Sequence, residues 1–356
     1  MTEPTNLYIP SDVHLGGQRT SASQLKRVTT CWQYHFLCDL APHPDIPNSA
    51  GLATRVTGAP LVTGSGVHAA IHSYFLSGFK DGEDSGERDV MKALAHAEEV
   101  VAARQHEMDS PEDYQKALNQ TRHCLIKFDE QLTAGGLTNK RVVADANGEA
   151  VLEREFQLPL AEGRFVYTDK VDGVFENDEG YHEIGEYKTS TFRFATTTLN
   201  NLHMQAQSYG HMGCLTSSYP EAPIGGLLFW VLVKDRGAKS DLPHIYERQV
   251  TIPPECVEQY LHDVTQTLED MVSRATAYTN LCNEGLDAYQ AGLMCYPQTG
   301  IMNGQCYRYN RPCEFAGYCE AHGYGSRMLQ GFRPRTVAGE PYKDESERVT
   351  QEGEMF

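Results

Sequence analysis

Three consecutive segments between residues 151 and 190 have the pattern of β-strands, and this run constrains the fold more than any other part of the chain. The segments are VLEREFQLPL (151–160), GRFVYTDKVDGVFE (163–176) and EGYHEIGEYKTS (179–190), which are rich in Val, Phe and Tyr and partly alternate between apolar and polar residues. Glycines and an Asn-Asp-Glu turn separate them. Because strands joined by short turns run in opposite directions, we expect three antiparallel strands.

Helical patterns lie on both sides of these strands. Apolar residues recur at three- and four-residue steps in 22–38, and the chain reads mainly as helix from about 64 to 135. After the strands we expect a helix over 197–216, two further strands in IGGLLFWVLVKD and HIYERQVTI, and a long helix opened by Pro253 and Pro254. This order predicts an α/β fold with a mixed central β-sheet flanked by helices.

The sequence predicts one large folded domain. With 356 residues, of which 40% are apolar, the chain can bury a sizeable core. We expect an N-terminal arm over 1–20, a single domain over 21–330 and a mobile polar tail over 331–356. Within the domain, the helical part covers about 64–135 and the strand-rich core about 150–250.

Charge and hydropathy exclude some classes of partner. The chain has 48 acidic and 30 basic residues and a net charge of -18, which disfavours non-specific adhesion to nucleic acid or to an anionic membrane. Any DNA contact must therefore be local. No stretch approaches the roughly 18 consecutive apolar residues that span a bilayer, and the N-terminus lacks the build of a secretory signal. We expect a soluble, cytoplasmic protein without a membrane partner.

Two carboxylates and one lysine have a spacing that places them on neighbouring strands. Asp172 lies in the second expected strand, and Glu186 and Lys188 lie in the third. Since side chains alternate along a strand, Glu186 and Lys188 share a face, and a hairpin can bring Asp172 beside them. Carboxylates of this kind hold Mg²⁺, which activates water against a phosphodiester while a lysine orients that water or stabilises charge. An exposed Glu/Lys pair is also common as a merely solvated face of a strand.

The arrangement resembles the PD-(D/E)XK nuclease superfamily, in particular its RecB-like exonuclease branch. In that branch the acidic residue closes a strand of the form seen here as DKVDGV, and the next strand carries an ExK, here EIGEYKTS. The resemblance implies a restriction-endonuclease-like core. It also implies that Asp172 and Glu186 bind Mg²⁺ or Mn²⁺ and that Lys188 orients the attacking water.

Two further motifs occur in the order that the family has them. The glycine-led helix start GSGVH contains His68, which the resemblance implies is a metal ligand. His72 lies one helical turn later, so a histidine pair or two exposed polar residues remain alternatives. Downstream, Gln205 and Tyr209 match the family's QxxxY motif, to which the resemblance assigns the positioning of the catalytic lysine and of DNA. Gln207 is a competing choice on a different face of the helix.

The cysteines are concentrated toward the two ends of the chain. Of the ten, Cys306, Cys313 and Cys319 lie within 295–325, a region rich in Gly, Pro, Asn and aromatic residues, where closely spaced thiols have little reason to fill a core. Three thiolates need a fourth partner to complete a tetrahedral zinc site or a four-cysteine iron-sulfur cluster. The spacing alone does not choose between zinc and iron.

A subset of RecB-like nucleases, including AddB-type helicase-nuclease subunits and CRISPR-associated RecB-like exonucleases, is similar to this chain. These proteins have one cysteine upstream of the nuclease core and three downstream. The resemblance implies that Cys31 joins the downstream trio to hold a [4Fe-4S] cluster that staples the two ends together. Six residues separate Cys306 from Cys313, where those relatives often have two or three. The replacement of Cys31 by Cys38, or of Cys306 by Cys295, therefore stays open.

Positive side chains must gather near the metal site if an acidic protein is to hold a polyanion. The candidates follow the third expected strand, follow the apolar strand, or lie in the cysteine loop: Arg193, Lys234, Arg236, Arg308 and Arg311.

Together these features predict a Mg²⁺- or Mn²⁺-dependent DNA exonuclease. We expect it to act on single-stranded DNA or DNA with free ends in phage or prokaryotic recombination and repair, alongside a recombination or helicase partner. A phage-encoded enzyme would work in the host cytoplasm. Two alternatives stay open: a non-catalytic DNA-binding or assembly module of the same fold, and a zinc-stapled hydrolase.

Overall fold

The computed structural model consists of two compact units, which are described separately. The first unit comprises Met1–Arg55, Pro159–Val166 and Val264–Phe356, and the second comprises Val56–Leu158 and Tyr167–Asp263. The structure describes residues 18–46, 48–53, 59–108, 110–137, 140–145, 147–191, 194–201, 206–219, 223–235, 243–302, 306–308, 311–320, 329–330, 332–337 and 340–341.

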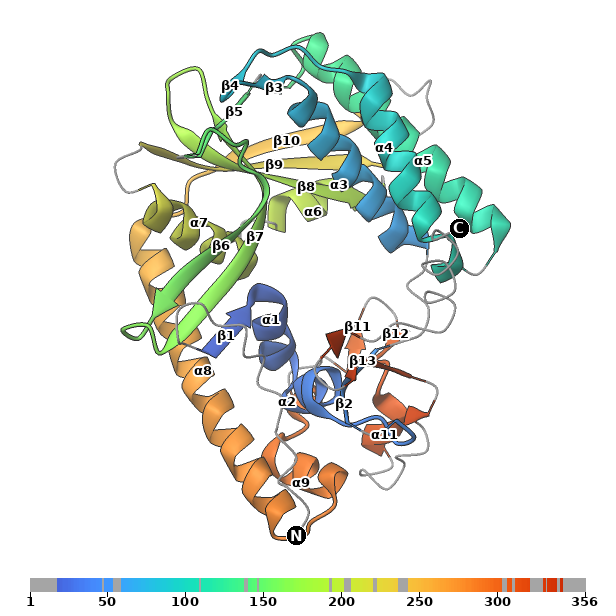
Figure 1. The fold of residues 1–356 in the computed structure, drawn as a ribbon, viewed down its shortest axis with the longest axis vertical. Helices are drawn as coiled ribbons and strands as arrows, with labels where there is room; N and C mark the ends of the chain where they lie inside the picture. Colours follow the sequence, from blue (N-terminus) through green and yellow to red (C-terminus); the bar gives the residue numbers. More distant parts are fainter. Residues whose placement is uncertain are drawn as a thin grey trace, which may run out of the picture. The chain divides into compact units, whose positions relative to one another are not determined.

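A mixed β-sheet forms the centre of the second unit (Figure 1). β7 and β8 are antiparallel, β8 and β9 are parallel, β9 and β10 are antiparallel, and both β5 and β6 pair with β7. The predicted hairpin of the second and third strands is thus confirmed, as is the mixed α/β fold. The strands are β5 (Arg141–Val142), β6 (Leu152–Leu160), β7 (Phe165–Glu176), β8 (His182–Ser190), β9 (Ile224–Val233) and β10 (Ile245–Val250).

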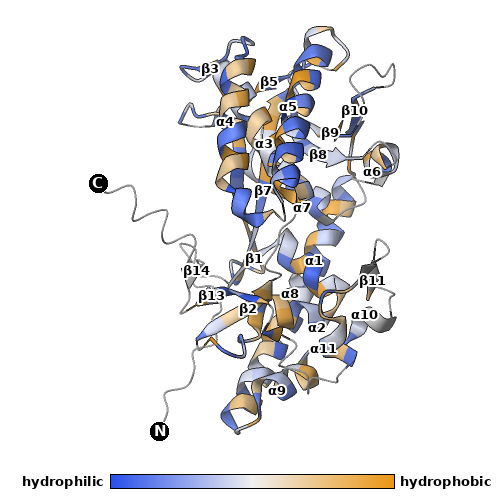
Figure 2. Ribbon diagram, turned by 90° about the vertical axis from the view of Figure 1, so that its right-hand side faces the viewer, coloured by the Kyte–Doolittle hydropathy of each residue, from blue (hydrophilic) through white to orange (hydrophobic). Residues whose placement is uncertain are grey.

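Helices cover both faces of this sheet (Figure 1). On one face, α3, α4 and α5 turn their apolar sides toward each other and toward the sheet, which Figure 2 shows as orange inner faces on these helices. Tyr187 and Trp230 of the sheet join Phe75 and Phe128 in a buried aromatic core there. The elements are α3 (Ala59–Ser77), β3 (Phe79–Lys80), β4 (Glu83–Asp84), α4 (Val90–Ala103), a 3₁₀ turn (Gln105–Glu107), α5 (Pro111–Thr133) and, on the opposite face, α6 (Ala195–Asn201) and α7 (Ala206–Ser218).

Two glycines face each other where β7 and β8 pair. Gly173 lies opposite Gly185, and a Cβ atom on Gly185 would lie 2.4 Å from the ring of Phe175 and 2.8 Å from that of Trp230. Both rings are buried in the aromatic core and have no space to retreat. The glycines therefore allow the aromatic core to cover the strands beside Asp172 and Glu186.

We expect Gly185→Ala to lower the free energy of unfolding by about 1–3 kcal/mol, because the added methyl group overpacks a dense core. Chemical denaturation measures this change. Gly64→Ala is the matched control, since the nearest atom to its added Cβ, Thr189 Oγ1, is 3.8 Å away. Equal stabilities for the two variants would contradict the packing argument.

The first unit is built from helices around an aromatic core. Phe36, Tyr278, Tyr296, Phe315 and Tyr318 are fully buried or nearly so and pack in one cluster. The elements are β1 (Gln18–Ser21), α1 (Ala22–Thr30), α2 (Trp32–His35), a π-helical turn (Phe36–Leu40), β2 (Ser49–Ala53), α8 (Pro254–Asn283, which begins in the second unit), α9 (Ala288–Cys295), α10 (Thr299–Met302), β11 (Tyr307–Arg308), β12 (Arg311–Pro312), α11 (Ala316–Glu320), β13 (Arg333–Val337) and β14 (Glu340–Pro341).

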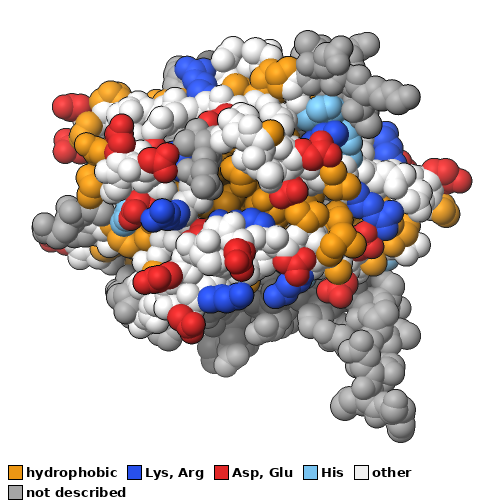
Figure 3. Space-filling view, turned by 90° about the horizontal axis from the view of Figure 1, so that it is seen from above, with side chains coloured by type: hydrophobic (Ala, Val, Ile, Leu, Met, Phe, Trp, Pro, Cys, Tyr) orange, Lys and Arg blue, Asp and Glu red, His pale blue; other side chains and the backbone are white. Residues whose placement is uncertain are grey.

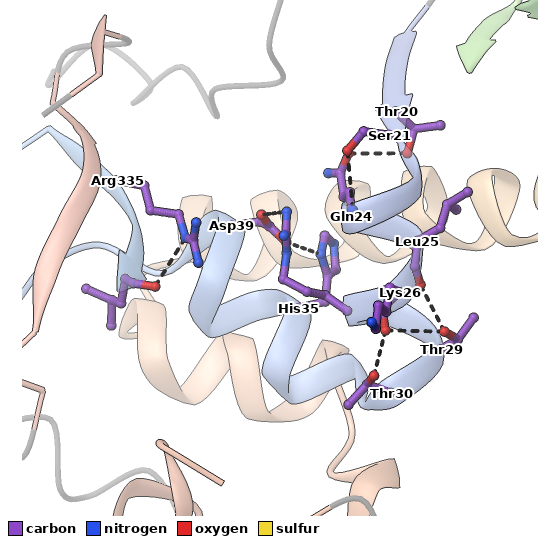
Figure 4. Close-up of polar contacts among 12 residues, drawn as sticks. Thr20, Ser21, Gln24, Leu25, Lys26, Thr29, Thr30, His35, Asp39 and Arg335 are labelled. Carbon is purple, nitrogen blue, oxygen red and sulfur yellow. Dashed lines mark hydrogen bonds and ion pairs between the residues drawn. The ribbon is translucent and has the colours of Figure 1, made fainter. Parts of the chain in front are cut away.

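The helix expected over 22–38 is interrupted at Cys31. Ser21 caps α1 by accepting a hydrogen bond from the Gln24 backbone N–H, as Figure 4 shows. At Cys31 the backbone becomes extended, with φ -169° and ψ 127°, and α2 begins at the next residue. Across the break, Asp39 accepts hydrogen bonds from Arg27 and contacts His35. The interruption therefore separates Cys31 from the regular helix on either side.

Part of the predicted C-terminal tail is a strand. Residues Arg333–Val337 form β13, which pairs with β2 and with β14. Arg335 also donates a hydrogen bond to the carbonyl of Leu52 (Figure 4). Backbone pairing orders this segment even though its side chains offer little to bury.

Among the helices of the described chain, none combines the length and the apolar character needed to cross a membrane.

Candidate active site

The structure places Asp172 and Glu186 next to each other on β7 and β8. Asp172 directly precedes Gly173, and Glu186 directly follows Gly185, the glycine that pairs with Gly173. Both carboxylates are buried. The backbone N–H of Tyr187 donates a 2.7 Å hydrogen bond to Asp172 Oδ2, which fixes this carboxylate against β8. Burial raises the pKa of Asp172, and the nearby charge of Glu186 raises it further. The two carboxylates are therefore close enough to repel each other, as a cation-binding pair does.

His68 reaches the same carboxylate from α3. Its Nδ1 atom lies 3.2 Å from Asp172 Oδ1 and 3.5 Å from an oxygen of Glu153 on β6. Burial lowers the pKa of His68, but Asp172 and Glu153 more than offset this effect and raise it to about 10. Potential ligand atoms of His68, Glu153 and Asp172 lie within 4.8 Å of one another. Glu186, the third metal ligand predicted from the sequence, is not part of this group, and neither is His72, the alternative on the same helix.

Glu153 was not identified from the sequence. It lies in a Glu-Arg-Glu stretch that reads as the solvated side of a strand, and only the pairing of β6 with β7 brings it to Asp172. Its φ of +49° is in the left-handed region, which is unusual for a residue other than glycine. One carboxylate oxygen forms an ion pair with Lys170 at 2.6 Å, and the other is buried without a hydrogen bond. The latter faces His68.

Lys188 lies on β8 beside Glu186 and donates a short hydrogen bond to Glu186 Oε1. Burial lowers the pKa of Lys188, but the carboxylates of Glu186 and Asp172 more than offset this and hold it above its ordinary value. Lys188 is therefore an ammonium group that donates hydrogen bonds. Burial raises the pKa of Glu186, but Lys188 and His211 more than offset this and lower it to about 2. This carboxylate stays ionised at neutral pH.

A second group missed from the sequence is His211 on α7 with Asp169 on β7. His211 Nε2 is hydrogen bonded to Glu186 Oε2 at 3.2 Å, and its Nδ1 lies 2.9 Å from Asp169 Oδ2. Burial lowers the pKa of His211, but the two carboxylates raise it to about 10. His211 lies two residues after Tyr209, on the helix of the QxxxY motif. Its place between two carboxylates depends on how α7 packs against the sheet.

The structure describes only some of the other residues that the sequence analysis predicted for the site. Tyr209 stacks on Tyr260 with ring centroids 5.6 Å apart, whereas Gln205 lies outside the described residues. The alternative Gln207 is half-buried on α7. Lys234 follows β9, and its backbone N–H donates to the Ser190 carbonyl at the end of β8.

Of the five basic residues predicted to contact DNA, the structure describes the side chain of Lys234 alone. Lys234 lines an open pocket of about 570 Å³ whose lining includes both the basic Lys116 and the acidic Glu112 and Asp235. Arg193 and Arg236 lie outside the described residues. On the face that Figure 3 shows, basic and acidic side chains are intermixed, and the described side chains there form no continuous basic surface. Arg308 lies on β11 and Arg311 on β12, but their side chains are not among the parts that the structure describes.

Four cysteines converge in the first unit. A Cβ atom on Gly300 would lie 3.3 Å from the sulfur atoms of both Cys31 and Cys306. Burial raises the pKa of Cys319 to about 12, and the neighbouring thiols of Cys313, Cys31 and Cys306 add to the increase. These four thiols therefore interact with one another.

The spacing of the downstream cysteines has a structural explanation. The strands β11 and β12 lie between Cys306 and Cys313 and pair antiparallel, and the Cys313 N–H donates a 2.7 Å hydrogen bond to the Cys306 carbonyl. The alternatives Cys38 and Cys295 are buried in the aromatic core of the same unit, against which Cys313 and Cys319 also pack.

The family model of the PD-(D/E)XK nuclease superfamily matches residues 19–320. No curated protein matches the sequence. Among solved structures, the crystal structure of SSO0001 is similar with 15% identity over 60% of this chain and 76% of that chain, at a TM-score of 0.24. With the family model covering most of its length, this chain belongs to the PD-(D/E)XK nuclease superfamily.

Proposed function

We propose that the protein is a Mg²⁺- or Mn²⁺-dependent exonuclease that hydrolyses phosphodiester bonds in DNA. The observation that carries this proposal is the meeting of His68, Asp172, Glu186 and Lys188 where α3, β7 and β8 approach one another. The group combines hard oxygen donors and an imidazole, which suit a small divalent cation, with an ammonium group beside them. Within the family to which the chain belongs, such a set serves nucleic-acid cleavage.

The residues present fit a divalent cation. Asp172 is held by the Tyr187 N–H through one oxygen and faces His68 through the other, and Glu153 adds a buried oxygen without a hydrogen bond. His68, Asp172 and Glu186 would hold the ion, with Glu153 as an additional ligand. A bound Mg²⁺ or Mn²⁺ supplies Lewis acidity toward a phosphate and a water molecule. Lys188 donates hydrogen bonds, so it orients that water and stabilises negative charge on the phosphate.

For the cysteines we propose a structural [4Fe-4S] cluster held by Cys31, Cys306, Cys313 and Cys319. The four thiols lie near one another in the first unit, which supports a group shared by all four. Four thiolates can hold either an iron-sulfur cluster or a zinc ion, so metal analysis of the purified protein distinguishes the two. The contribution of the cluster would be to fasten Cys31 to the C-terminal loop.

We place the activity in phage or prokaryotic recombination and repair, on single-stranded DNA or DNA with free ends. Tyr209, stacked on Tyr260 near His211 on α7, together with Gln205, is proposed to position the substrate. Arg193, Lys234, Arg236, Arg308 and Arg311 are the proposed phosphate contacts. A recombination or helicase partner supplies free ends in such a pathway.

End-labelled DNA tests the proposal. Protein purified without oxygen is incubated with linear single-stranded DNA and with a closed circle of the same sequence, in Mg²⁺, Mn²⁺ or EDTA. We expect the linear strand to be shortened only in the presence of a metal ion and the circle to survive, because an exonuclease requires an end. If the circular DNA is degraded as fast as the linear strand, the protein is an endonuclease and not an exonuclease. If every DNA form stays intact, the non-catalytic module is the better account.

A further inference from the structure

The carboxylate of Glu186 is held on both sides by protein side chains. Lys188 donates to Oε1, and the ring of His211 contacts Oε2 at 3.2 Å. A glutamate otherwise turns about its terminal bonds, but two partners on opposite oxygens fix the plane of this carboxylate. Each carboxylate oxygen has a second lone pair, so both oxygens can still accept a further ligand.

His211 is itself held by a buried chain of polar contacts. Its other ring nitrogen lies 2.9 Å from Asp169 Oδ2, which also accepts a 3.0 Å hydrogen bond from the hydroxyl of Tyr167. The second oxygen of Asp169 accepts a hydrogen bond from the Lys170 backbone N–H at 3.1 Å. His211 and Asp169 are 1% and 6% exposed, so water does not compete for these contacts.

The sequence at α7 permits this close approach. A Cβ atom on Gly210 would lie 2.0 Å from the Tyr167 hydroxyl and 2.8 Å from Asp169 Oδ2. Any other residue at this position would therefore push α7 away from β7 or displace both side chains. Glycine next to His211 lets the helix backbone lie directly against the pair that holds the ring.

We propose that His211 and Asp169 are positioning residues that orient Glu186 as a metal ligand. The proposal rests on the metal-dependent function of this site. Asp169 fixes the ring of His211, and the ring fixes the carboxylate plane of Glu186 toward Asp172. Partners of this kind, one contact removed from a metal ligand, are worth about 10- to 100-fold in metal affinity. Both residues act through Glu186.

Mn²⁺ binding to the full chain without DNA tests the proposal, measured by calorimetry and by the paramagnetic resonance of free Mn²⁺. We expect His211→Leu to weaken binding about 10- to 100-fold, because it leaves Oε2 without its partner. His211→Gln retains an N–H at a similar place and should recover most of this loss. Asp169→Asn should give an intermediate loss, because the ring remains but its anchor is weaker.

Lys140→Met is the matched control. Lys140 and Glu183 form a buried ion pair at 2.8 Å, and Glu183 is on the same strand as Glu186. This variant should lower Tm while leaving Mn²⁺ binding unchanged. The comparison separates a loss of buried charge pairing from a loss of metal positioning. Should His211→Leu fail to fold, His211→Gln and Asp169→Asn still measure the effect.

The outcomes distinguish this inference from the proposed function. If wild-type protein binds Mn²⁺ but cleaves no DNA, the proposed nuclease activity is wrong. The Mn²⁺ affinities of the His211 variants still test the positioning role. Equal Mn²⁺ affinity for wild type, His211→Leu and Asp169→Asn would overturn the positioning role even if DNA is cleaved. A wild-type protein that binds no Mn²⁺ would overturn both.

Discussion

Replacing Lys188 with methionine should abolish DNA cleavage, with a loss in kcat of at least about 10²- to 10³-fold. Methionine has nearly the length of the lysine stem but has no ammonium group, so it removes the donor to Glu186 and, in the proposed mechanism, the donor to the scissile phosphate. The proposed metal ligands His68, Asp172 and Glu186 remain. Initial rates on end-labelled linear DNA at saturating Mg²⁺ measure the loss, and a thermal melt shows whether the fold persists.

The specificity of this effect is tested with a second lysine. Lys127 on α5 forms a 2.6 Å ion pair with Glu130 at the protein surface. Lys127→Met removes the same charge and should leave cleavage unchanged, because a surface ion pair contributes at most about 1 kcal/mol to stability. Comparable rates for Lys188→Met and wild type would show that this ammonium group has no part in catalysis.

The second large effect is expected at the cysteines. Cys313→Ser should remove the brown colour and the broad absorbance near about 400 nm that an iron-sulfur cluster produces. The cluster would tie Cys31 to Cys319 across most of the chain, and closure of so long a loop contributes on the order of 5 kcal/mol to stability by the entropic model. We therefore also expect a large decrease in Tm. Iron and sulfide analysis after anaerobic purification gives the cluster content.

Cysteines outside the convergent group provide the control. Cys256 is exposed on α8 and Cys295 is buried at the end of α9. Cys256→Ser and Cys295→Ser should keep the absorbance, because neither residue belongs to the proposed ligand set. A colourless wild-type protein that contains zinc would favour the zinc alternative. If colour persists in Cys313→Ser, the ligand set itself is wrong.

Much of the fold was predictable because it is encoded by local patterns. Alternation in 163–176 and 179–190 specified two strands, and a short turn between them required an antiparallel hairpin, which the structure has. The same alternation put Glu186 and Lys188 on one face. The mixed sheet is confirmed, whereas the helix break at Cys31 was missed, because an apolar period of three to four residues continues across it.

Local sequence patterns do not predict contacts between segments that are far apart in the chain. Glu153 reads as a solvated strand residue until β6 pairs with β7, and its side chain then meets His68 and Asp172. His211 lies in a helix of small and polar residues, and no periodicity marks it as the partner of Glu186. The six-residue gap after Cys306 left the exact ligand set open, and the pairing of β11 with β12 within that gap could not be read from the spacing.

The sequence by itself determined the β7–β8 hairpin and the shared face of Glu186 and Lys188, because these depend on side-chain alternation and turn residues within a few positions of one another. Tertiary structure decided which groups complete the site. α7 brings His211 to Glu186, and β6 brings Glu153 to His68. The physical reason is that these contacts depend on the packing of elements far apart in the chain, which sequence periodicity does not record.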